Sequence, residues 1–232
     1  MKKAILLNVL ALFFCRTLHS QKPEAQAIKL TNPSFEGVPE LGEKTFNLNG
    51  WLDCGFPGET PPDVHPVPGG KFGVTQKPAD KKSYLGLVVR KDDTWEMVSQ
   101  RLSTAMLADT CYEFSISLCR SQRYESPLNP IDDKTIVPFT TPAKLRIWGG
   151  SGYCDKAELL AESQLIESPD WQDNTFYFKP EQSHKYILFE AFYSKTPFRY
   201  NGHLLLDNAS DIFPVSCEEA LLNDKGPKPG GN

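Results

Sequence analysis

The sequence of 232 residues lacks the short motifs of the common catalytic sites. It contains no GxSxG nucleophile elbow, no HExxH zinc motif and no P-loop, and the glycine-rich residues 149–152 lack the lysine and helix that phosphate binding requires. Histidine is scarce, because beyond His19 only His65, His184 and His203 occur, without metal-ligand spacing. The sequence therefore predicts a protein that is not an enzyme.

The sequence also lacks an excess of positive charge. The formal net charge is -4, whereas nucleic-acid-binding domains usually carry a basic stripe, so we expect no nucleic-acid partner. No CxxC pair occurs, which argues against zinc-ribbon and thioredoxin-like sites. No internal repeat of solenoid or propeller period is present.

The longest apolar run, residues 4–14, follows the positive residues 1–3 and precedes a small polar stretch that ends at Ser20. This is the layout of a signal peptide, and the run is too short to cross a bilayer. We predict a signal peptide over residues 1–20 and a chain that is secreted, periplasmic or at the cell surface. Lipoprotein processing at Cys15 is disfavoured by the two phenylalanines before it. No second apolar run follows, so no transmembrane segment is expected.

Five cysteines follow the predicted signal peptide: Cys54, Cys111, Cys119, Cys154 and Cys217. In an oxidising compartment this number permits at most two disulfides and leaves one thiol over. The pairing is open, although Cys54 with Cys217 would tie a loop to the chain end. Cys119 ends an alternating segment in phase with polar residues, so it is the candidate for the free thiol.

Strand signals recur at short intervals after Pro78. The clearest is at residues 111–120, where apolar side chains alternate with polar ones. The other expected strands are residues 31–37, 84–90, 95–102, 144–148, 157–163, 171–179, 185–193 and 203–213. Residues 157–163 could also form a helical turn, but an isolated helix this short is marginal. Eight or nine strands without a long periodic helix predict an all-β antiparallel sandwich or jelly roll.

We expect one domain over residues 31–217, after a lead-in at 21–30 and before a flexible tail at 218–232. Residues 38–78 are rich in proline and glycine and should form a long ordered loop rather than sheet. Such loops are often binding elements, although a surface crossing held by a disulfide is an equal alternative. Residues 120–141 are polar and interrupted by proline, hence loop.

Three segments carry a resemblance to a known family. Residues 32–37 read Asn-Pro-Ser-Phe-Glu-Gly, residues 50–51 read Gly-Trp, and residues 206–208 read Leu-Asp-Asn. Together they resemble galactose-binding-like jelly rolls, particularly the carbohydrate-binding modules that open with N-x-x-F-E. Residues 145–150, 154–163 and 188–193 are similar to uncharacterised secreted proteins of Bacteroidota-type bacteria. Some of those proteins carry such a domain beside an OmpA-like peptidoglycan-binding domain.

The resemblance implies a structural calcium ion between the first and last strands. Its ligands would be Glu36 and Asp207, with backbone carbonyls near Ser34 and after Gly50. Calcium takes six to eight hard oxygens, so such a set is sensible chemistry. Independently, Asp207 interrupts a line of leucines, and a buried carboxylate needs a partner. The alternative is that Glu36 is exposed and Asp207 hydrogen-bonds its own turn.

Candidate ligand-binding residues lie on the outward phase of the expected strands. Arg146 and Trp148 share one such face, and Glu190 is out of phase with its apolar neighbours. Glu113 is a further candidate from a strand, and Tyr193 would add an aromatic ring from a loop. Aromatic faces and planar polar groups suit sugar binding. Arg146 and Glu190 could equally form a structural ion pair across neighbouring strands.

These features predict a secreted, non-catalytic module that recognises glycan at the cell surface or outside. The alternative is an envelope domain that contacts protein partners through its proline-rich loop and binds no sugar. A structure in which residues 38–78 cover Arg146, Trp148 and Glu190 would favour the envelope domain. Glycan identity and oligomeric state are left open by the sequence.

Overall fold

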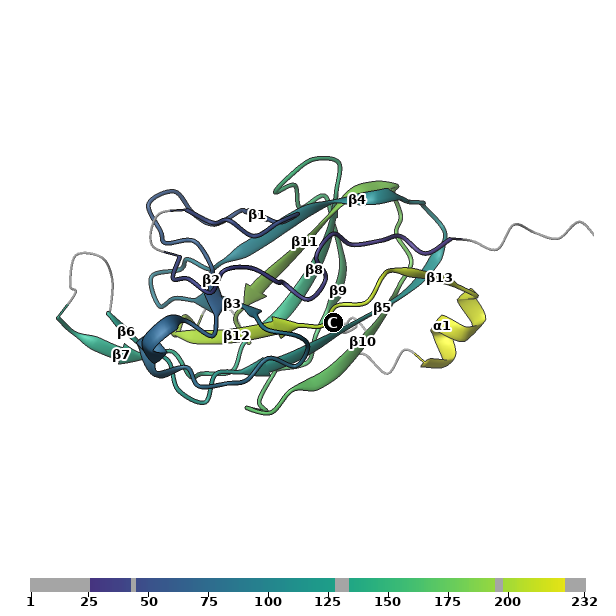
Figure 1. The fold of residues 1–232 in the computed structure, drawn as a ribbon. Coiled ribbons are helices and arrows are strands. Elements are labelled where there is room, and N and C mark those ends of the chain that lie inside the picture. The colour runs from purple at the N-terminus through teal and green to yellow at the C-terminus, as the bar shows by residue number, and fades with distance from the viewer. Residues whose placement is uncertain (1–25, 43–44, 128–133, 195–197, 224–232) are drawn as a thin grey trace, which may run out of the picture.

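The structure, a computed structural model, describes residues 26–42, 45–127, 134–194 and 198–223. Two antiparallel sheets pack face to face (Figure 1). The five-stranded sheet has the order β1 (Leu52–Asp53), β4 (Met97–Met106), β11 (His184–Phe192), β8 (Lys144–Gly150) and β9 (Glu158–Glu162). The six-stranded sheet has the order β10 (Gln172–Phe178), β5 (Cys111–Arg120), β12 (Gly202–Asp207), β3 (Tyr84–Val89) and β2 (Asp63–His65), and β13 (Phe213–Val215) also pairs with β5. The predicted antiparallel jelly-roll sandwich is confirmed.

The core lies between the two sheets, because the period of two buries one side of each long strand. An aromatic chain crosses it: Trp51 lies 5.1 Å from Phe35 and 5.2 Å from Phe189, and Phe189 lies 5.6 Å from Phe114 between ring centroids. Each such ring contributes about 1.5–3 kcal/mol by burial. Trp51 therefore attaches the N-terminal segment to Phe189 of the five-stranded sheet.

The two ends of the domain meet, as the resemblance implied. Ile28 forms an antiparallel bridge with Ile212, and the N–H of Ala209 donates to the carbonyl of Pro33 at 3.0 Å. Phe35 and Leu206 are both fully buried in the core. The expected strand at residues 31–37 is nevertheless wrong.

Residues 32–36 form a turn instead. Asn32 and Phe35 have positive φ angles of 54° and 50°, which a strand does not allow. The Asn32 side chain closes the turn, accepting the N–H of Glu36 at 2.8 Å and donating to its carbonyl at 2.9 Å. Asparagine suits this position because it tolerates the left-handed region and bonds nearby backbone.

The loop predicted at residues 38–78 is largely irregular, with only β1, β2 and the 3-10 helix η1 (Pro68–Gly73) among its described residues. Residues 120–141, also predicted as loop, contain the hairpin of β6 (Glu125–Pro127) and β7 (Ile136–Pro138). Residues 157–163 form strand β9, as preferred.

Residues Cys217–Asn223 form the helix α1, so the first part of the predicted flexible tail is helical. The N–H of Glu219 donates to Ser216 Oγ at 3.1 Å, and a disulfide joins Cys217 to Cys111 on β5. Residues 224–232 and the predicted signal peptide lie outside the described residues. No helix within the described part of the chain is long and apolar enough to span a membrane.

The second disulfide joins Cys54 to Cys154, so the expected pair of Cys54 with Cys217 is wrong. Sequence order cannot show which loops meet at one edge of a sandwich. The prediction that Cys119 is the free, buried thiol is confirmed. Two disulfides fit the oxidising compartment that an exported protein enters.

Candidate functional site

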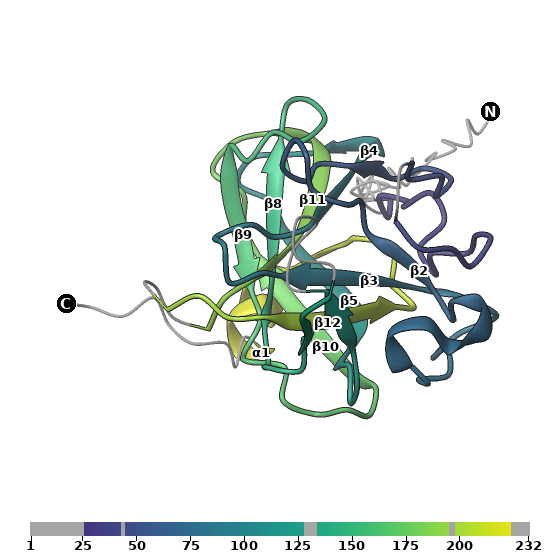
Figure 2. The ribbon, with the colours of Figure 1, turned by 90° about the vertical axis from the view of Figure 1, so that its left-hand side faces the viewer.

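Glu190 lies at the centre of a polar cluster on the outer side of the five-stranded sheet. Strand β11 places Ile187, Phe189 and Ala191 in the core, and alternation turns Glu190 to the other face. Neighbouring strands β8, β9 and β11 lie side by side in Figure 2. The side chain of Glu190 is only 1% exposed, so its charge depends on partners inside the protein.

Three donors converge on this carboxylate. Oε1 accepts the indole N–H of Trp95 at 2.6 Å and the ammonium of Lys156 at 2.9 Å, and Oε2 accepts the indole N–H of Trp148 at 2.7 Å. The Lys156 nitrogen also lies 5.5 Å and 5.4 Å from the ring centroids of Trp95 and Trp148. The cation therefore interacts with two aromatic faces as well as with the acid. We call these four residues the Glu190 cluster.

Two loops cover the Glu190 cluster. The Cys54–Cys154 disulfide joins the segment after β1 to the loop between β8 and β9, which carries Lys156. Phe56, from the proline-rich loop, packs edge-on against Trp95 with ring centroids 4.9 Å apart. We expected that a cover by residues 38–78 would favour the envelope domain over a lectin. This cover is present in part, because Glu190 is closed off from solvent.

The rim of the cluster presents aromatic side chains to solvent. Tyr153 is 52% exposed and packs edge-on against the partly exposed Tyr186 at 4.7 Å. Trp148 is partly exposed beside Leu159, its cross-strand partner on β9. A ligand could therefore contact ring faces at this rim while Glu190 holds Trp148 in place from beneath.

Arg146 is the direct cross-strand partner of Glu190, but no ion pair joins them in the described structure. The Arg146 guanidinium instead pairs with Glu162 at 2.7 Å and lies 3.6 Å from the ring centroid of Phe192. The expected alternative of an ion pair between Arg146 and Glu190 is therefore wrong. Lys156, on the β8–β9 loop, takes that place.

Of the other two predicted site residues, one lies on the other sheet, and one is buried with its ring centroid 6.0 Å from that of Trp95. Glu113 is on β5 of the six-stranded sheet, opposite Tyr177, because alternation fixes the face of a strand but not the sheet it joins. Tyr193 is buried, and its hydroxyl donates to the carbonyls of Arg90 and Thr94 at 2.5 Å and 3.0 Å. The structure thus brings Arg146, Trp148 and Glu190 onto one face and leaves Glu113 out. That any of them binds a ligand stays a prediction.

Sequence reasoning missed Trp95 and Lys156. Trp95 precedes β4 directly after a turn, and Lys156 lies in the loop between β8 and β9. An alternation pattern cannot identify either residue.

Glu36 and Asp207 bind the same segment before β3. Asp207 Oδ2 accepts the N–H groups of Ala79 and Asp80 at 2.8 Å and 2.9 Å. Glu36 Oε1 accepts the N–H groups of residues 82 and 83, both at 3.1 Å. Burial raises the pKa of Asp207 to about 6, against the pull of these hydrogen bonds. The two acids therefore meet through residues 79–83.

These contacts leave little for a calcium ion. The N–H of Asn208 donates to Asp207 Oδ1 at 2.7 Å, so three backbone N–H groups already point at this acid. The Lys81 ammonium lies 3.0 Å from Ser34 Oγ, near the expected carbonyl ligand, where it would repel a cation. The donor set fits calcium poorly, because an ammonium group and several backbone N–H groups lie where the ion would bind. Calcium at Glu36 and Asp207 stays a prediction.

Neither a protein-family model nor a curated protein matches the sequence. Solved structures match by fold. An arabinose-bound α-L-arabinofuranosidase matches 83% of this chain at 11% identity with a TM-score of 0.50, and this chain spans only 27% of that enzyme. A cyclase from Fischerella sp. TAU matches 82% of this chain and 98% of its own length, at 12% identity with a TM-score of 0.50.

The CBM22-1 xylan-binding domain of Xyn10C from Paenibacillus barcinonensis matches 83% of this chain and 99% of its own length, at 18% identity with a TM-score of 0.44. Carbohydrate-binding modules are thus among the structures similar to this chain. The matches concern the fold, and the resemblance to secreted proteins of Bacteroidota-type bacteria stays a prediction.

Proposed function

We propose that this chain is an exported, non-catalytic module that binds glycan at the rim of the Glu190 cluster. Sugars are recognised by ring faces that stack on their C–H surfaces and by polar groups that bond their hydroxyls. Trp148, Tyr153 and Tyr186 supply the rings, and Lys156, with a side chain 34% exposed, supplies a donor.

The observation that carries this proposal is the fixed position of Trp148. Its indole N–H is bound to a buried carboxylate at 2.7 Å, and the neighbouring loop is tied by the Cys54–Cys154 disulfide. A ring held in this way loses little conformational freedom when a ligand stacks on it. The site is preorganised for a short glycan or the end of a longer one, since the middle of the sheet is covered.

The fold is shared with part of an arabinose-bound arabinofuranosidase, which suits a protein that meets sugars. It is also the fold of a cyclase, so the absence of catalysis is part of the proposal and not of the comparison. Glu190 suits a structural role better than an acid–base role, because three donors occupy its two oxygens.

A second candidate function is an envelope domain that binds protein and no sugar. The observation that favours it is the cover over the sheet: Leu188 and Ser99, in the middle of the face, are each 1% exposed. Leu52 and Leu159, at the two edges, are exposed apolar residues that a protein partner could cover.

A glycan array separates the two functions. The chain from residue 21 should bind at least one glycan class, and Tyr153→Ala should weaken that binding about tenfold because one stacking ring is lost. Phe213→Ala is the matched control, since Phe213 is an exposed ring on the six-stranded sheet. No binding by the unmodified chain, or equal losses in both variants, would favour the envelope domain.

A further inference from the structure

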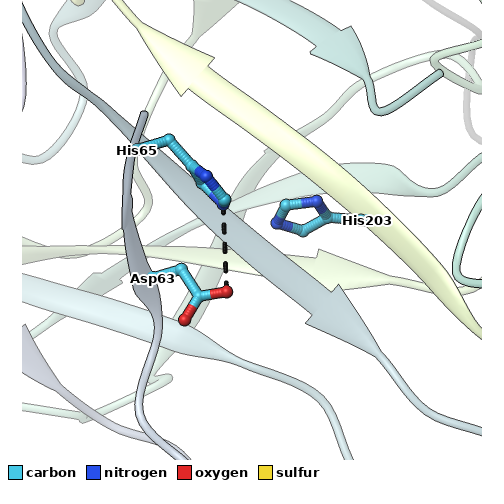
Figure 3. Close-up of side chains that lie close together, drawn as sticks. All are labelled: Asp63, His65 and His203. Carbon is cyan, nitrogen blue, oxygen red and sulfur yellow. Dashed lines mark ion pairs between the residues drawn. The ribbon is translucent and has the colours of Figure 1, made fainter. Parts of the chain in front are cut away.

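A second polar cluster lies on the six-stranded sheet. Asp63 and His65 project from β2, and His203 projects from β12, on the two sides of β3. Their side chains point toward one another beside β3 (Figure 3). One ligand atom from each residue lies within 4.8 Å of the others. The sequence showed no metal-ligand spacing because these residues are brought together only by the sheet.

All three side chains are closed off from solvent, with exposed fractions of 7% for Asp63, 0% for His65 and 1% for His203. Both ring nitrogens of His65 and Nε2 of His203 have no hydrogen-bond partner among the described residues. His65 Nε2 lies 3.8 Å from Asp63 Oδ2, which is too long for a hydrogen bond. Since most buried polar groups are paired, three unpaired imidazole nitrogens in one place need an explanation.

The charged groups beside the imidazoles are paired with one another. The nearby Arg90 is compensated by ion pairs to Glu96 at 2.5 Å and Glu59 at 3.4 Å, so its charge is not free to repel a cation.

The remaining atoms of the cluster are held in place by hydrogen bonds. His203 Nδ1 lies 2.7 Å from Ser121 Oγ, and when Nδ1–H donates to that oxygen, Nε2 directs its lone pair into the cluster. Asp63 Oδ1 accepts the N–H of Gly42 at 2.8 Å, and Oδ2 accepts the hydroxyl of Tyr124 at 3.0 Å. Such outer contacts orient the ligands of metal sites.

The strand between the histidines is shaped around them. A Cβ atom at Gly86 of β3 would lie 2.2 Å from His203 Nε2 and 3.0 Å from His65 Cδ2. The glycine therefore makes the room in which the two rings approach. Tyr124 closes the cluster from outside, with its ring centroid 4.2 Å from that of His203.

We propose that Asp63, His65 and His203 bind a divalent transition-metal ion, with zinc as the natural occupant. Two imidazoles and one carboxylate are ligands that zinc accepts, and the fourth position would be taken by a further oxygen donor. Zinc–nitrogen bonds of about 2.0–2.1 Å require ligand atoms about 3.3 Å apart, so the side chains move closer around the ion. Its effect is to fasten β2, in the long proline-rich loop, to β12.

The test uses the tag-free chain from residue 21, because a histidine tag would bind metal itself. Elemental analysis after dialysis against zinc should find one ion per chain, and zinc should raise Tm. His65→Gln and His203→Gln should weaken zinc binding by more than about 100-fold, beyond the loss seen for outer contacts. His184→Gln is the matched control, because His184 is also buried but is bound to Glu158 at 2.7 Å, and it should bind zinc as the unmodified chain does.

Cobalt(II) keeps the test decisive if the variants do not fold. Bound to the unmodified chain in place of zinc, it should give the strong visible bands of a four-coordinate site with nitrogen ligands. An unmodified chain that takes up no zinc, or that gives only the weak spectrum of hydrated cobalt, overturns the proposal. Zinc binding that is unchanged in both His65→Gln and His203→Gln overturns it as well.

Discussion

The indole N–H of Trp148 donates to Glu190 Oε2 at 2.7 Å across two neighbouring strands of the five-stranded sheet. The bond is diagonal, because Arg146 is the residue directly opposite Glu190. The same carboxylate binds Trp95 and Lys156. One buried acid therefore fixes three side chains from three parts of the chain.

Glu190→Gln should destabilise the fold by about 2–4 kcal/mol. An amide accepts hydrogen bonds only through its oxygen, so an indole N–H is left facing the NH2 group, and Lys156 loses its counter-ion. The shift in the urea midpoint at constant slope measures this loss. Glu162→Gln is the control: its ion pairs with Lys144 and Arg146 are partly exposed, so we expect less than about 1 kcal/mol. Equal losses would contradict the role of Glu190.

Replacing both Cys54 and Cys154 by serine should cost about 2–4 kcal/mol, since this disulfide closes a loop with a sequence separation of 100. It should also loosen the cover over Trp95 and Trp148, seen as stronger acrylamide quenching of tryptophan fluorescence. Serine at Cys111 and Cys217 is the comparison, because that disulfide anchors α1. It should lower stability without changing the quenching. Unchanged quenching in the first variant would show that the disulfide does not hold the cover.

The thiol of Cys119 should be unreactive in the folded chain. Burial raises its pKa to about 12, and only the thiolate reacts readily. A thiol reagent at neutral pH should label no cysteine in the native chain from residue 21 and one after denaturation without reductant. Labelling of the native chain would mean a different pairing or an open strand β5.

Stability should depend on pH through Asp207. Its pKa rises from 3.8 to about 6 on folding, so below 3.8 both states carry the proton and the folded state has no disadvantage. As pH rises between the two values, the unfolded chain releases the proton first, and the fold loses up to about 3 kcal/mol. The free energy of unfolding of the unmodified chain, minus that of Asp207→Asn, should therefore fall across this window, with chelator present throughout. A difference that is constant with pH would contradict the raised pKa.

Removal of calcium should leave Tm unchanged if the backbone N–H groups of residues 79–83 alone compensate Glu36 and Asp207. If instead calcium is bound at about 100 times its Kd, as the family resemblance implied, EDTA would cost about 2.7 kcal/mol, or roughly 5–10 °C in Tm. Melting with EDTA and with excess calcium decides between the two. Magnesium in place of calcium is the control for ionic strength.

The alternation of apolar and polar residues predicted most of the long strands. In β5 and β8 it follows directly which side chains are buried, so these strands can be recognised without knowing their partners. It failed where a side chain overrides the pattern, as at Asn32, whose amide closes a turn over a segment that reads as a strand. It also failed where the answer depends on distant partners. Glu113 and Glu190 alternate in the same way, yet they belong to different sheets.

The alternation of side chains also predicted part of the candidate site. Arg146, Trp148 and Glu190 lie on paired strands, so their common face followed from phase. Lys156 and the Cys54–Cys154 disulfide come from loops, where no periodicity exists to read. The two histidines beside β3 are separated by 138 positions in the chain (203 minus 65), and only strand order makes them neighbours.

Gly86 places a condition on how this protein can vary. A methyl group there would occupy the place of the His203 ring, so alanine at this position is compatible with the fold only when the imidazole has been exchanged for something smaller. Among relatives, a glycine at position 86 and a histidine at position 203 should therefore be inherited or lost together.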